Sequence, residues 1–305
     1  NTYNTAVGFQ AGAAVTTSTQ NTLIGGLAGD ALTTGSQNVA VGYDALGAET
    51  TSANNVAIGR EALKTQNGAA NNTVIGRAAG ALLTTGANNT FVGSGAAGNG
   101  TVTGNANNCI GMNTLYALTS GASNSALGDS AGLNITTGSN NLFLGHDSGR
   151  SGSPGGQFAA SSNTIVLGDE NISQCFIQVD WTVSSDERDK TDFNELDLGL
   201  DFVKALEPVT YYWDKRSKYG DKYAEDYDLN AQTPDGTHKE NWMDIGFKAQ
   251  AVQALEEAAG YTAAANKNLT VSLGEDGQSY QRPRRNYYCI NSACRRARII
   301  GGHHV

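Results

Sequence analysis

Over the first 168 residues, polar and hydrophobic positions repeat as a short phrase: Asn, two variable residues, an aliphatic residue and Gly. The phrase reads NTLIG at Asn21, NVAIG at Asn55 and NSALG at Asn124. Its glycines recur every 17 residues, with one step of 18 and a last step of 23, at Gly8, Gly25, Gly42, Gly59, Gly76, Gly93, Gly111, Gly128, Gly145 and Gly168. A fixed period of this kind indicates a repeat architecture.

A period of 17 residues is too short for a pair of helices, which takes more than about 30 residues. It predicts one coil of a β-solenoid, in which a short β-rich run is followed by small residues and a turn. We expect the aliphatic residue before each Gly to point inward, and the Ala two or three residues past the Gly to fill the next corner. Gly permits the positive φ of a tight corner, and Asn can stack in ladders from coil to coil.

Ten such coils, stacked about 4.8 Å apart, make a rod of about 48 Å. A single coil cannot bury its own apolar face, and large apolar residues are few in each coil. We therefore expect the remaining apolar face to be buried between chains, in a homotrimer. The period breaks over residues 146–162, where glycines cluster. This segment is a candidate loop for contact with a host cell-surface glycan or protein, or a hinge; alternatively, the array is a stiff spacer that binds nothing.

The pattern changes after the array. Residues 171–183 alternate with a period of two, through Cys175, Ile177, Val179 and Trp181, which predicts a connecting strand. Further on, the pattern predicts a helix ending before Pro208, a strand over 209–213, a helix from about 246 to 259, and a hairpin joining 268–273 to 278–281. The predicted organisation is an all-β solenoid over 1–170, the connecting strand over 171–183 and an α+β domain over 184–305.

Charge distinguishes the two halves and excludes some functions. The formal net charge is −9; residues 1–183 hold 4 Lys or Arg and 9 Asp or Glu, against 16 and 20 in residues 184–305. A negative balance argues against a general nucleic-acid binder. The sequence contains no run of 18 apolar residues, so we expect no membrane insertion. It begins at Asn1 within the repeat pattern and without Met, which favours a fragment in which no signal peptide is visible.

Cysteines and histidines indicate neither a metal site nor a cofactor. Cys109, Cys175, Cys289 and Cys294 lack the paired spacing of a zinc site. We expect them to act as small apolar filler. His146, His238, His303 and His304 form no ligand pattern along the sequence.

Candidate chemistry lies at the border of the two halves, in residues 184–190. Ser184 with Glu187 forms a capping box, so this stretch predicts the start of a helix. The same stretch contains the phrase SDERDK from Ser185 to Lys190. Two further phrases follow it in order: LEPV at Leu206, with Tyr211 and Tyr212, and GFKAQAV at Gly246.

Together these phrases resemble the intramolecular chaperone domain of endosialidases and phage tail spikes, the peptidase S74 family, over residues 184–281. The NVAVG and NVAIG phrases of the array resemble the head repeats of trimeric autotransporter adhesins, although those repeats are usually shorter. Similar repeats occur in phage tail fibres.

The resemblance implies a domain that trimerises, guides the upstream fibre into register and is then removed autocatalytically. The scissile bond would be Ser184–Ser185, with Ser185 as nucleophile and Lys190 as general base. A serine hydroxyl is inert until a base takes its proton, and a lysine acts as that base only when burial or nearby cations lower its pKa. Asp186 and Arg188 would support the site, Arg188 by depressing the pKa of Lys190.

The sequence therefore predicts a segment of a trimeric phage tail fibre, extracellular in the virion and used in host attachment. The alternative is a bacterial trimeric surface adhesin that keeps its C-terminal domain. An enzyme acting on host polysaccharide is disfavoured, because the array shows no paired acids in a cleft-forming context.

The end of the chain departs from the family, which normally finishes in a long amphipathic helix. Residues 282–305 contain six arginines and no acid. We interpret this tail as an out-of-frame reading of the usual helix, which sequencing of the encoding DNA would test. A tail altered in this way would impair trimerisation and cutting.

Overall fold

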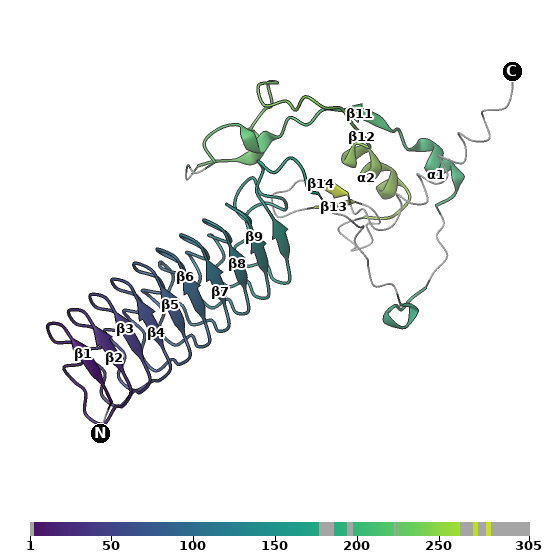
Figure 1. The fold of residues 1–305 in the computed structure, drawn as a ribbon. Helices are drawn as coiled ribbons and strands as arrows, with labels where there is room; N and C mark the ends of the chain where they lie inside the picture. The colour runs from purple at the N-terminus through teal and green to yellow at the C-terminus, as the bar shows by residue number, and fades with distance from the viewer. Residues whose placement is uncertain are drawn as a thin grey trace, which may run out of the picture. The chain divides into compact units, whose positions relative to one another are not determined.

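A computed structural model describes residues 3–176, 186–193, 198–222, 224, 226–262, 271–273 and 279–281. The chain divides into two compact units. The first comprises residues 1–172 and 220–232, and the second comprises 173–219 and 233–305. The first unit is a stack of similar coils, each contributing one strand to the same sheet (Figure 1).

The sheet of the first unit has ten parallel strands in sequence order, each three residues long. Most residues pair with the residue 17 positions further on, as in Ala57 with Val74. The predicted β-solenoid is thus confirmed. The strands are β1 (Thr5–Val7), β2 (Thr22–Ile24), β3 (Val39–Val41), β4 (Val56–Ile58), β5 (Thr73–Ile75), β6 (Thr90–Val92), β7 (Asn108–Ile110), β8 (Ser125–Leu127), β9 (Leu142–Leu144) and β10 (Ile165–Leu167).

The predicted orientation of the aliphatic residues is wrong. The middle residue of each strand points inward: Leu23, Val74 and Phe91 are fully buried. The aliphatic residue before the Gly points outward, and Ile75 is 37% exposed. Successive strand residues face opposite sides, and the Asn that starts each phrase lies on the inner side with the middle residue. The corner alanines are placed as predicted, since Ala28, Ala45, Ala62, Ala79, Ala96 and Ala131 are fully buried.

The buried asparagines form a continuous ladder along the solenoid. Asn72 illustrates the pattern. Its side-chain oxygen accepts the backbone N–H of Asn89 at 2.9 Å, and its amide nitrogen donates to the carbonyl of Gly86 at 3.0 Å. Each side chain therefore links its own coil to the next. These hydrogen bonds satisfy the side-chain amide, whose burial without hydrogen-bond partners would cost free energy.

Glycine is required at the corner after each strand. At Gly76 the backbone has a φ of 141°, which side chains rarely adopt. A Cβ at this position would also lie within 3.0 Å of the backbone of Gly93 in the next coil. The repeated glycine thus allows the coils to approach one another at strand spacing.

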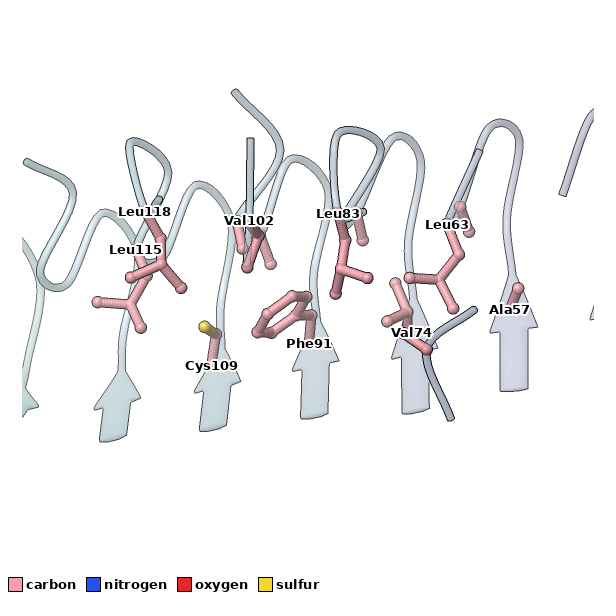
Figure 2. Packing of buried hydrophobic residues seen from close by; sticks show 14 of the residues in the cluster. Ala57, Leu63, Val74, Leu83, Phe91, Val102, Cys109, Leu115 and Leu118 are labelled. Carbon is pink, nitrogen blue, oxygen red and sulfur yellow. The ribbon is translucent and has the colours of Figure 1, made fainter. Parts of the chain in front are cut away.

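Residues of different sizes pack together in the interior of the solenoid (Figure 2). The ring of Phe91 lies against Gly80, where an added Cβ would be 3.1 Å from it. Cys109 fills an interior position as predicted, and burial raises the pKa of its thiol, which makes it unreactive.

The last coil differs from its predicted register. Ile165 pairs with Leu142, and Thr164, rather than Asn163, takes the place of the ladder asparagine. The N–H of Thr164 donates to the side-chain oxygen of Asn141 at 3.0 Å. Because threonine has no amide to continue the pattern, the ladder ends here. The irregular segment 146–162 packs against β9 through Phe158, which is 6% exposed and lies 6.0 Å, ring to ring, from Phe143.

The second unit is small and mixed, as the sequence predicted. It contains α1 (Leu200–Ala205), β11 (Val209–Tyr211), β12 (Asp244–Gly246), α2 (Ala249–Ala258), β13 (Val271–Leu273) and β14 (Ser279–Gln281), with 3-10 turns η1 (Glu187–Asp189) and η2 (Arg216–Lys218). A third turn, η3 (Leu229–Ala231), lies in the first unit. Strands β11 and β12 pair antiparallel, as do β13 and β14, which confirms the predicted hairpin. β12 had no counterpart in the sequence prediction.

The core of the second unit is a cluster of Leu206, Val252 and Val271, against which Phe202, Phe247 and Leu255 pack. None of the described helices is long and apolar enough to cross a membrane.

The connecting strand is not seen in its described part. Residues 171–176 belong to no strand, and the rest of the prediction, residues 177–183, lies outside the described residues. Cys175 is exposed, so it is not apolar filler, and Phe176 is 90% exposed. Alternation alone does not make a strand, since backbone groups need a neighbouring strand to bond to.

Candidate processing site

The border stretch forms a single tight turn in its described part. η1 spans Glu187–Asp189, and Asp186 is its N-cap, with the side chain accepting the backbone N–H of Arg188 at 2.9 Å. Lys190 ends the turn by donating its backbone N–H to the carbonyl of Glu187 at 3.1 Å. In the described residues the predicted helix start is a 3-10 turn capped by Asp186; Ser184, the predicted cap, lies outside them.

Asp186 and Arg188 form an exposed ion pair across the turn. Nε and Nη2 of Arg188 donate to the two carboxylate oxygens of Asp186 at 3.0 and 2.6 Å. The hydrogen bonds from Arg188 hold the pKa of Asp186 below its ordinary value, and Asp186 raises the pKa of Arg188. Because Arg188 is already engaged by Asp186, its charge is partly neutralised. The supporting role predicted for Arg188 beside Lys190 stays a prediction.

Lys190 is exposed at the end of the turn. Ser184 and Ser185 lie outside the described residues. The pairing of Ser185 with Lys190 therefore stays a prediction.

The two other phrases of the border domain build its scaffold. Leu206 and Val252 lie in the same core cluster, and Val209 pairs with Gly246 in the β11–β12 ladder. The chain reaches β11 through Pro208, which cannot continue α1. These residue types are thus explained by packing and strand pairing rather than by chemistry.

The capped turn and the two scaffold phrases all lie within one segment that matches a known family. Residues 185–261 match the Peptidase S74 family, described as the chaperone of endosialidase. No curated protein and no solved structure matches the chain. Members of this family are autoproteolytic chaperone domains, and the chain joins a parallel β-solenoid to a segment that matches the family. We refer to residues 185–261 as the chaperone segment.

Part of the chaperone segment belongs structurally to the first unit. Residues 220–232 are assigned there, and Nζ of Lys222 lies 3.3 Å from the carboxylate of Asp147 and in contact with that of Glu170. Arg150 donates to the other oxygen of Asp147 at 2.8 Å. The acids are almost completely buried, and burying them costs free energy unless cations pair with them. Lys222 therefore stabilises the last coil.

His146 and Asp169 complete this cluster. Nδ1 of His146 lies 3.5 Å from Asp169 and 3.6 Å from Asp147, which brings together three groups that could ligate a metal ion. Arg150 and Lys222 already supply positive charge to Asp147, so we interpret the cluster as a network of ion pairs. The expectation of no metal at this protein's sites stays a prediction.

The cluster was not anticipated from the sequence, although a signal for it exists. His146–Asp147 and Asp169–Glu170 directly follow Gly145 and Gly168, the glycines that end β9 and β10. Residues at equivalent positions of neighbouring coils lie side by side, so a comparison of the last two repeats would have placed these residues together. Lys222, from a distant part of the chain, carried no such signal.

Proposed function

We propose that the chaperone segment trimerises the chain, guides the β-solenoid into register and is then released by self-cleavage between Ser184 and Ser185. In this proposal the solenoid is part of a phage tail fibre used in host attachment. The observation that carries the proposal is the position of the family match, which begins at Ser185, shortly after the last solenoid coil.

A template for assembly answers a physical problem of this solenoid. Because most coils repeat at 17 residues, a slip of one coil between neighbouring chains preserves most contacts. Joining three chains at one end raises their effective concentration and selects one register. Removal of the template after assembly leaves the fibre kinetically trapped, because the species that guided folding is gone.

The proposed cut uses Ser185 and Lys190. The hydroxyl of Ser185 attacks the carbonyl carbon of Ser184 while the amine of Lys190 takes the hydroxyl proton. Collapse of the tetrahedral intermediate expels the backbone nitrogen of Ser185, which takes up a proton, and leaves an ester between Ser184 and the Ser185 side chain. Water then hydrolyses the ester and frees the two pieces.

The exposure of Lys190 in the single chain makes assembly a condition for this chemistry. Burial of its amine against another copy would disfavour the charged form and lower its pKa. Cutting would then follow trimerisation rather than precede it. This order suits a template, since a chain cut before assembly would lose its guide.

The experiment is to express the full chain and separate it on a denaturing gel. We expect two pieces, residues 1–184 and 185–305, from the parent chain. Ser185→Ala and Lys190→Ala should each give one full-length band. Ser217→Ala and Lys204→Ala are the matched controls, since they change another serine and another exposed lysine but leave the scissile bond and the proposed pair intact.

A full-length band in every variant would contradict the self-cleavage proposal. It would favour the alternative of a bacterial surface adhesin that keeps its C-terminal domain. The chaperone role is tested separately, by sedimentation of uncut Ser185→Ala. A monomeric mass for that variant would contradict trimerisation.

A further inference from the structure

The outer face of the solenoid sheet presents a continuous aliphatic column. Strand pairing places the residues before the corner glycines side by side from coil to coil. They are Val7, Ile24, Val41, Ile58, Ile75, Val92, Ile110, Leu127, Leu144 and Leu167, which we call the aliphatic ladder. Several of its members are well exposed, including Ile110 at 50% and Leu127 at 52%.

The neighbouring column on the same face is uncharged. It consists of the first residue of each strand: Thr5, Thr22, Val39, Val56, Thr73, Thr90, Asn108, Ser125, Leu142 and Ile165. The residues after the corner glycines border the ladder and are mixed, from Phe9 and Tyr43 to Arg60 and Arg77. An apolar, charge-free centre with a mixed rim is the composition of a protein–protein interface.

The size of this face fits contact with the same face of other copies. Ten strands about 4.8 Å apart span about 43 Å, and four residues at about 3.3 Å each give a width of about 13 Å. The face therefore covers about 560 Å² per chain, or about 1,700 Å² when the faces of three chains meet around one axis, against the roughly 1,000 Å² that a specific interface needs.

The regular spacing of the aliphatic ladder indicates which kind of partner it binds. A partner that contacts the whole length must present matching groups about every 4.8 Å over some 43 Å. A globular protein or a short glycan would cover only a few coils. Another copy of this solenoid has the same spacing, the same length and the same uncharged face.

We propose that the aliphatic ladder is the surface through which copies of this chain pack, with their solenoids parallel and their ladders facing one another. The proposal rests on the proposed trimerisation, because an interface of this modest size needs the chaperone segment to hold the chains together. The proposed contact lies on the outer face of the sheet. The buried asparagines lie on the opposite, inner face.

Cysteine cross-linking of the full chain tests the geometry. Ile75→Cys and Leu82→Cys form a matched pair, since Ile75 is 37% exposed on the ladder and Leu82 is 38% exposed in the same repeat but off the strand. Both are made with Ser185→Ala and with Cys175, Cys289 and Cys294 changed to Ser. Under mild oxidation we expect several-fold more covalent dimer on a denaturing gel from Ile75→Cys than from Leu82→Cys.

Charge insertion gives a second readout in uncut Ser185→Ala. Combining Ile75→Lys with Ile110→Lys should shift the sedimenting mass toward the monomer on dilution, whereas Leu82→Lys should not. Circular dichroism spectra equal to the parent show that the solenoid itself is intact.

The outcomes separate the two proposals. A monomeric parent would contradict trimerisation itself. A trimeric parent with equal cross-linking from residues 75 and 82, and with no effect of the lysines, would overturn the ladder proposal alone and indicate a different occupant for this face.

Discussion

Glu49 shows how a single charged residue is accommodated inside a solenoid with few ionisable groups. It is fully buried. One carboxylate oxygen accepts the N–H groups of Thr51 and Ser52 at 2.8 and 2.7 Å, and the other accepts from Gln66 and Gly68 at 3.1 and 3.0 Å. Burial raises the pKa of Glu49, but the hydrogen bonds outweigh it, so the pKa is lowered overall. The carboxylate is thus a structural acceptor for turn backbone.

The lowered pKa makes stability depend on pH in a defined direction. A depressed folded-state pKa contributes stability that is fully present above the unfolded value, about 4.3, and is lost as pH falls through the folded value. We expect Glu49→Gln to be less stable than the parent at pH 7 by about 1–3 kcal/mol, because its amide cannot accept from Gln66 and Gly68. The difference should shrink below about pH 4.

Urea unfolding at a series of pH values measures this difference. Glu61→Gln is a suitable control, since Glu61 is a partly exposed acid in the next coil. Parallel pH curves for the parent and Glu49→Gln would contradict the assignment.

At the scale of the element, each strand is held to the next by its asparagine as well as by its backbone. Asn72 is fully buried and donates its amide to Gly86 and to the side chain of Gln66. Its neighbour Asn71 is exposed, has a φ of 62° and joins the preceding coil through its backbone N–H, which donates to the carbonyl of Ala53. The two adjacent asparagines therefore differ in role: Asn71 adopts the left-handed backbone conformation of the corner, whereas the buried side chain of Asn72 links neighbouring coils.

Asn72→Asp should destabilise the solenoid by on the order of 3 kcal/mol or more. The substitution buries a charge and places a carboxylate oxygen against the acceptor oxygens of Gly86 and Gln66. Asn71→Asp should change the free energy of unfolding by no more than about 0.5 kcal/mol, since aspartate tolerates the left-handed conformation. Equilibrium denaturation of both variants measures the contrast. Equal effects would show that the buried amide does not contribute to stacking.

At the scale of the whole molecule, the chain combines an array with strongly repeated contacts and a segment with its own small core. Parallel strands that are distant in sequence pair slowly, because the entropy cost of closing the loop between them comes before the stabilising contacts form. A template at one end is expected to matter more for such an array than for a domain with local contacts.

The refolding of uncut and cut protein tests this expectation. Uncut Ser185→Ala, unfolded in denaturant and then diluted, should recover the β-type circular dichroism spectrum and the trimer mass. The processed parent, freed of its released piece, should recover little of either. Equal recovery from both would contradict a chaperone role while leaving the cut itself unaffected.

Much of this architecture follows from the sequence alone. The 17-residue period determined the coil, the strand register and the place of the corner glycines, because each coil pairs with the next at the same positions. The border phrases determined the order of α1, β11 and α2, since proline ends the first helix and apolar periodicity marks the second. The same phrases indicated the family that residues 185–261 match.

The tertiary structure decided which side of each strand faces inward. A three-residue strand offers two faces, and the more hydrophobic residue, Ile75, was expected inside. Instead Val74 and Asn72 are buried, because stacked coils supply the acceptors and donors that an isolated coil lacks. The ladder asparagine is satisfied only by its neighbours in adjacent coils, so its burial is a property of the stack. Likewise Lys222 meets Asp147 and Glu170 only after the chain has folded back, a contact between distant residues that no local pattern encodes.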